Sequence, residues 1–129
     1  MENRRALLRT LFAAGLAAAA PSPSRAAVIR KQPLSGDFDG LEATFVEVVY
    51  EPGRSSAPHR HPGFVLGYVL EGQFRFAVKG EPEKVLGPGE VFYEPPDAVH
   101  LVSGNGGDTT ARILAIIIAE KEAPLTTPV

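Results

Sequence analysis

The chain has 129 residues and a formal net charge of −2 at neutral pH; this is the length of one domain, without the basic excess that would favour nucleic acid. Hydrophobic residues make up 44% and charged residues 22%, so the chain can bury a core. The lack of cysteine excludes disulfides, thiol nucleophiles, iron–sulfur clusters and cysteine zinc sites. No apolar run approaches the roughly 18 residues of a membrane span, and no stable membrane insertion is expected once the leader is removed.

Residues 1–26 resemble an export signal. Three arginines precede an uncharged apolar stretch at residues 11–20, and the small residues at positions 24 and 26 offer a cleavage site. The paired Arg4 and Arg5, followed by apolar residues and a further arginine, also resemble a twin-arginine signal. An ordinary Sec signal is the alternative. Either route predicts a periplasmic or secreted protein.

The rest of the chain has the pattern of an all-β domain. Residues 27–40 are expected to form an N-terminal arm, and residues 120–129 a C-terminal tail that is frayed from residue 124 onward. Between them, short apolar or alternating segments are separated by glycine and proline turns. The expected strands are 41–50, 65–70, 74–78, 84–86, 91–94, 99–103 and 112–119. Such short, evenly spaced strands predict one antiparallel sandwich or barrel over residues 41–119.

The chain has three histidines, and their positions favour a metal site. His59 and His61 stand at i and i+2, so on a strand both side chains point to the same side. The third, His100, follows a Pro-Pro-Asp turn where another strand begins. Three imidazoles suit Fe, Zn, Ni, Cu or Mn. The alternative is a surface His-x-His beside prolines, without any function.

Two glycine- and proline-framed motifs surround these histidines and resemble those of the cupin superfamily. The matching residues are Gly53, His59, His61 and Gly72 in the first motif, and Gly89, Pro95 and His100 in the second. The resemblance implies a single-domain jelly-roll β-barrel over residues 41–119. It also implies that the three histidines are metal ligands.

The chain departs from the family pattern at three positions. The family's first-motif glutamate ligand falls on Val65, the glycine of the second motif is Asp97, and its closing asparagine falls on Gly104, with Asn105 one place late. A site of three neutral imidazoles would keep the full charge of a divalent ion and favour an anionic or readily deprotonated substrate. In cupins such sites imply a non-haem iron dioxygenase acting on a small organic molecule. The alternatives are a zinc-dependent hydrolytic or isomerising cupin, or a non-catalytic cupin that binds a small ligand or metal.

Several side chains are candidates for the wall of this site. Tyr68 and Tyr93 are the candidate catalytic residues, as hydrogen-bond donors or acids. Phe74 and Phe76 are interpreted as core. Glu94 could supply the missing carboxylate from another strand, but the favoured interpretation is a turn residue ahead of two prolines.

We also expect a homodimer. A small jelly roll has edge strands that must be paired, covered or charged. The apolar strand at residues 113–118 and the segment at residues 28–34 are the candidates to cross between subunits.

Overall fold

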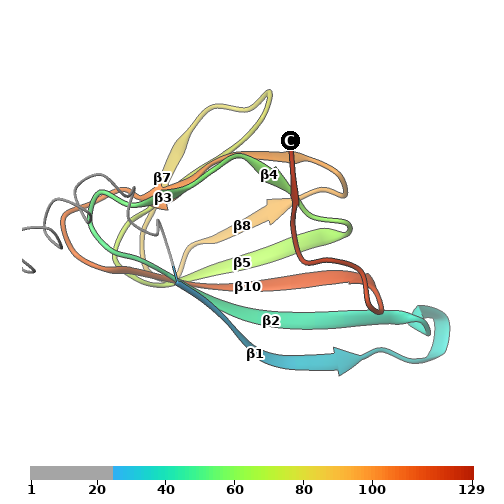
Figure 1. Cartoon of the computed structure of the whole chain (residues 1–129). Helices are drawn as coiled ribbons and strands as arrows, with labels where there is room; N and C mark the ends of the chain where they lie inside the picture. Colours follow the sequence, from blue (N-terminus) through green and yellow to red (C-terminus); the bar gives the residue numbers. More distant parts are fainter. Residues whose placement is uncertain (1–24) are drawn as a thin grey trace, which may run out of the picture.

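The computed structural model describes residues 25–129, which contain strands, turns and one short 3₁₀ helix (Figure 1). The elements in chain order are β1 (Arg25–Pro33), η1 (Gly36–Phe38), β2 (Leu41–Tyr50), β3 (Ser55–Ser56), β4 (His59–Arg60), β5 (Phe64–Glu71), β6 (Phe74–Val78), β7 (Lys84–Leu86), β8 (Val91–Glu94), β9 (Val99–Asn105), β10 (Ala111–Glu120) and β11 (Thr127–Pro128). Within these residues, no helix is long and apolar enough to cross a membrane.

The strands form two sheets, and every strand pair is antiparallel. The first sheet has the order β1-β2-β10-β5-β8, and the second has the order β11-β4-β9-β6-β7, with β3 also paired to β9. Apart from the consecutive pairs β1–β2 and β6–β7, neighbouring strands in these sheets are distant in sequence, as in a jelly roll. The predicted all-β jelly-roll domain is therefore confirmed.

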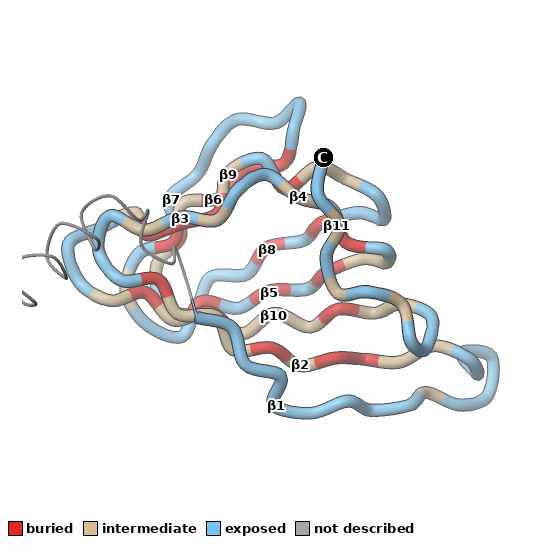
Figure 2. Tube along the Cα trace, in the orientation of Figure 1, coloured by how far each residue is buried: buried red, intermediate tan, exposed pale blue. Residues whose placement is uncertain are grey.

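The core lies between the inward faces of the two sheets, where alternate residues of each strand are buried (Figure 2). On β5, for example, Val65 and Val69 are 1% and 0% exposed. Gly67 stands between them, and a Cβ on it would lie 1.9 Å from the ring of Phe92 on neighbouring β8. The absent side chain makes room for a core phenylalanine.

The same alternation leaves apolar side chains on the outer face of β5 and β8. Leu66, Tyr68 and Leu70 on β5, with Val91 and Tyr93 on β8, are between 39% and 68% exposed. These five residues form the outer apolar strip. An apolar face of this kind is unusual on an isolated soluble domain.

Both ends of the described chain are more ordered than the sequence suggested. Residues 1–24 of the expected export signal lie outside the described residues, while Arg25 and Ala26 already belong to β1. The arm expected at residues 27–40 contains most of β1, which pairs along β2 from Arg25↔Val49 to Pro33↔Glu42. All nine residues of β1 are exposed, since nothing in the described chain covers either face of this edge strand.

The expectation of a frayed C-terminal end is wrong. Residues Thr127 and Pro128 form β11, which pairs with Arg60 and His59 of β4. After β10 in the first sheet, the chain therefore runs to the edge of the second sheet, beside the strand that carries His59 (Figure 1). Backbone pairing and a half-buried Leu125 hold this segment in place.

Candidate metal centre

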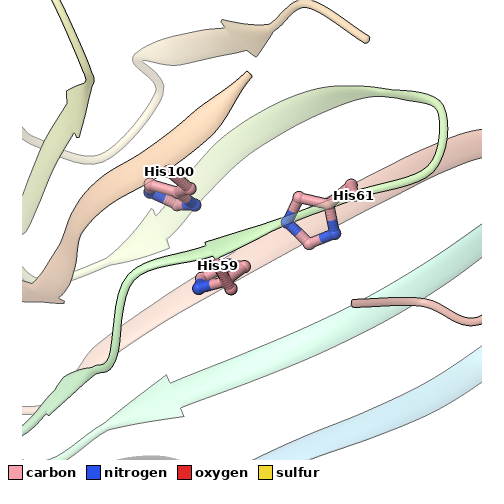
Figure 3. Close-up of side chains that lie close together, drawn as sticks. All are labelled: His59, His61 and His100. Carbon is pink, nitrogen blue, oxygen red and sulfur yellow. The ribbon is translucent and has the colours of Figure 1, made fainter. Parts of the chain in front are cut away.

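Three histidine side chains meet between the two sheets. His59 on β4 lies directly opposite His100 on β9 in the strand register, and His61 follows β4 on the same side (Figure 3). Their ring centroids lie 4.9 Å apart for His59–His61, 4.9 Å for His59–His100 and 6.4 Å for His61–His100. The structure thus brings together the three residues that the sequence proposed as ligands.

Backbone carbonyls fix which nitrogen of two rings faces the cluster. The Nδ1 of His59 lies 2.8 Å from the carbonyl oxygen of Ala57, and the Nδ1 of His61 lies 2.7 Å from that of Leu125. A carbonyl only accepts, so each Nδ1 donates its proton and Nε2 keeps a free lone pair. This is the usual arrangement of a metal-binding imidazole, whose other nitrogen is held by an outer partner.

The residues fit a divalent metal ion. One nitrogen of each ring lies within 4.8 Å of the others, and small rotations of the rings would bring them within the at most about 4.2 Å that separates two nitrogens each about 2.1 Å from one ion. Burial lowers the pKa of His59, which favours the neutral form that binds metal. His100 is 4% exposed, and neither of its nitrogens has a hydrogen-bond partner among the described residues. The three-histidine cluster can therefore hold a divalent ion.

Glu94 is a fourth polar residue of this centre, and its interpretation as a turn residue is wrong. It is the last residue of β8, points inward and is 3% exposed. Its Oε1 lies 3.7 Å from Nε2 of His61, and its Oε2 lies 3.1 Å from Nδ1 of His100. Glu94 stands directly opposite Val65 in the β5–β8 register, so the two side chains share the inner face.

The histidines open onto a cavity of about 510 Å³ between the sheets. Most of its wall is apolar, from side chains such as Val48, Phe74 and Ile117. Among the described residues, no lysine or arginine lines it. The residues after β10 close one side, because Leu125, Thr126, Thr127 and Pro128 also line the cavity.

Tyr50 is the cavity tyrosine that the sequence analysis missed. Its hydroxyl lies 2.6 Å from Oγ of Ser103 and 2.8 Å from Oγ of Ser56, and all three residues line the cavity. Burial raises the pKa of Tyr50, so its phenol stays protonated and can donate one hydrogen bond. The strand alternation could have identified it. Tyr50 stands two residues after Val48 and four after Val46, and both valines face the cavity.

Tyr68 and Tyr93 do not line this cavity. They are 44% and 51% exposed and belong to the outer apolar strip. Side chains alternate between the two faces of a strand. Tyr68 lies between the inward-facing Gly67 and Val69, and Tyr93 lies between the inward-facing Phe92 and Glu94, so both tyrosines point outward. Neither tyrosine is therefore part of the cavity wall.

The other sequence interpretations near the site agree with the structure. Phe74 and Phe76 are buried in the core. Asp97 has a φ of 61°, the left-handed conformation that the family's glycine would adopt most readily and that aspartate tolerates in turns. Arg60, which lies between His59 and His61, is exposed.

Comparison with known proteins supports the assignment of the fold. The family model of the cupin domain matches residues 46–117. A germin-like protein, subfamily T member 3, from Arabidopsis thaliana is 32% identical over 99 residues, covering 70% of this chain and 43% of that protein. The chain thus spans less than half the length of this curated relative.

Solved structures show the same fold. An oxalate oxidase matches with a TM-score of 0.65 and 21% identity, covering 86% of this chain and 57% of that one. A cupin-like protein from Thermotoga maritima matches with a TM-score of 0.64 and 22% identity, covering 82% and 75%. At these identities the likeness carries the fold alone.

Proposed function

The chain belongs to the cupin family, and we propose that it is an iron-dependent oxygenase acting on a small organic substrate, with the ion held by His59, His61 and His100. The observation that carries the proposal is the convergence of three imidazoles, each offering a free nitrogen, at the wall of a largely apolar cavity. A bound iron(II) ion would supply the one-electron chemistry toward dioxygen that protein side chains lack.

The cavity wall supports a substrate of modest polarity. With no lysine or arginine among its described lining residues, the cavity offers a carboxylate no cationic side chain, so an acidic group would have to pair with the ion itself. The apolar wall would bind a hydrocarbon or aromatic portion. The hydroxyls of Tyr50 and Ser103 could orient a polar substituent through hydrogen bonds. We therefore propose a small, mostly apolar molecule with one oxygen- or sulfur-containing chelating group.

We also propose that the protein works after export, in the periplasm or outside the cell. Support comes from the basic start, apolar stretch and small residues of the first 26 positions. Fusion of residues 1–26 to a reporter enzyme tests this proposal, and a reporter that stays in the cytoplasm would contradict it. Replacing Arg4 and Arg5 by lysine should block export if the twin-arginine route is used.

The proposed oxygenase function is tested by elemental analysis of protein purified from its native compartment. The proposal expects iron at about one ion per chain. Nitric oxide, used as a stand-in for dioxygen on the iron(II) protein, should give a paramagnetic resonance signal of an iron–nitrosyl centre. Zinc in place of iron, or iron that does not bind nitric oxide, would overturn the oxygenase proposal and favour a hydrolytic or ligand-binding cupin.

A further inference from the structure

Glu94 has the features of a residue built to face a cation. Its side chain is 4% exposed, and its Oε1 has no hydrogen-bond partner among the described residues. A buried carboxylate is stable only when a partner balances its charge and satisfies its oxygens. Among the described residues, the ionisable contacts of Glu94 within 4.0 Å are His61 and His100.

An ion pair with a protonated histidine explains this arrangement poorly. Such a pair would require a hydrogen bond from the ring to the carboxylate. The 3.1 Å contact between Nδ1 of His100 and Oε2 of Glu94 lacks the direction of a hydrogen bond, and both nitrogens of His100 remain without a partner. These atoms lie close together without bonding to one another, as ligand atoms around a common ion do.

The contact with His61 indicates where that ion would lie. Because the carbonyl of Leu125 occupies Nδ1 of His61, the nitrogen left for metal is Nε2. Oε1 of Glu94 lies 3.7 Å from this same Nε2. Two donor atoms each about 2.1 Å from one ion are separated by at most about 4.2 Å. Oε1 is therefore within the range of a second ligand to the ion that His61 would bind.

We propose that Glu94 is the fourth protein ligand of the metal centre and supplies, from β8, the carboxylate that the family pattern places at residue 65. The strand register explains how Glu94 can take the place of a carboxylate at residue 65. Val65 and Glu94 are directly paired, and their side chains project from adjacent strands into the same cavity. This inference rests on the three-histidine centre of the proposed function and adds to it the carboxylate.

A carboxylate ligand changes what the centre prefers. It lowers the net charge of a bound divalent site by one and leaves about two of six octahedral positions open, in place of three. The preference for a strongly anionic substrate that a three-histidine site predicted is therefore weakened. An oxygen donor also raises the relative affinity for Mn²⁺, because imidazole suits nickel and zinc while carboxylate suits manganese.

The test measures the affinities of the purified full chain for Mn²⁺ and for Ni²⁺ by competition with a coloured chelator. Four proteins are compared: wild type, Glu94→Gln, the exchange variant Glu94→Val with Val65→Glu, and the control Glu83→Gln. Glu83 is an exposed carboxylate that pairs with Arg75 and does not line the cavity. Thermal melting confirms that each variant is folded.

We expect Glu94→Gln to weaken Mn²⁺ binding about 100-fold or more, beyond the usual effect of losing an outer partner, with a smaller loss for Ni²⁺. The exchange variant should recover most of the Mn²⁺ affinity, and Glu83→Gln should bind as wild type does. Equal loss for both metals without recovery in the exchange variant would mean that Glu94 only orients His100, and would overturn the inference. Unchanged affinity in Glu94→Gln would overturn it as well.

If the exchange variant does not fold, the comparison of Mn²⁺ with Ni²⁺ in Glu94→Gln decides alone. A larger loss for Mn²⁺ supports a carboxylate ligand, and an equal or smaller loss contradicts it. Failure of the underlying centre would look different: the His59→Ala, His61→Ala and His100→Ala variants would then bind metal as wild type does.

Discussion

Deleting residues 124–129 should weaken metal binding although it removes no ligand. The segment contributes β11, which pairs with β4 at Arg60 and His59, and the carbonyl of Leu125, which accepts a hydrogen bond from Nδ1 of His61 at 2.7 Å. Without it, the ring of His61 can rotate, and its two nitrogens compete for the proton.

The size of the effect follows from these contacts. The lost hydrogen bond is worth about 1 kcal/mol of stability, and the removal of an outer partner of a ligating histidine weakens metal binding about 10- to 100-fold, or about 1.4 to 2.8 kcal/mol. The matched control is deletion of Val129 alone, which is 60% exposed and lies beyond β11.

Chelator competition gives the affinities, and nitrogen NMR of the imidazoles in the metal-free protein reports the tautomer of His61. We expect Nδ1 of His61 to be protonated in the full chain, and a mixture of tautomers after deletion of residues 124–129. Equal metal affinity and an unchanged tautomer in the two truncated proteins would refute the role of the Leu125 carbonyl.

Three further predictions concern stability and assembly. Gly67→Ala should lower the free energy of unfolding by about 1 to 3 kcal/mol through overpacking, because its Cβ would meet the ring of Phe92; Gly87→Ala, whose Cβ would have no contact closer than 3.6 Å, is the control in thermal melting. Burial lowers the pKa of His59 below 6.5, so the unfolded chain binds the proton more readily and the metal-free protein should lose stability as the pH falls below 6.5. A His59→Gln variant should lose less over the same range, and identical melting profiles would contradict this. The expected homodimer should appear by light scattering at micromolar concentration and weaken on Leu66→Asp, since Leu66 is exposed on the outer apolar strip; a monomeric wild type would end that prediction.

The strands and the histidine cluster could be read from sequence because their signals are local. Period-two alternation and glycine turns mark each strand, and the i, i+2 spacing of His59 and His61 places both rings on one side. The position of His100 relative to them rested on the resemblance to the cupin motifs, since nothing local indicates that β4 and β9 pair.

The remaining residues of the site depend on information that a single strand does not carry. The inward and outward faces of β5 are both apolar, so the alternation of apolar and polar residues that would show which way Tyr68 points is missing from the sequence. Tyr93 lies on the neighbouring strand β8, whose outer face is apolar as well. Glu94 reaches the centre because β8 pairs with β5 in the register that sets Glu94 opposite Val65, and the sequence of β8 alone does not indicate that register. The C-terminal segment has no alternating pattern, and its order comes from pairing with the edge of β4.

The central claim, a divalent metal centre built on His59, His61 and His100, is tested most directly by metal content per chain after dialysis against a chelator. Wild type and the three single His→Ala variants are compared, with folding checked by circular dichroism. We predict that wild type keeps about one ion per chain and that each variant loses it while remaining folded, because the core beneath the histidines is apolar. A folded variant that retains the full complement of metal, or a wild type that retains none, would contradict the claim.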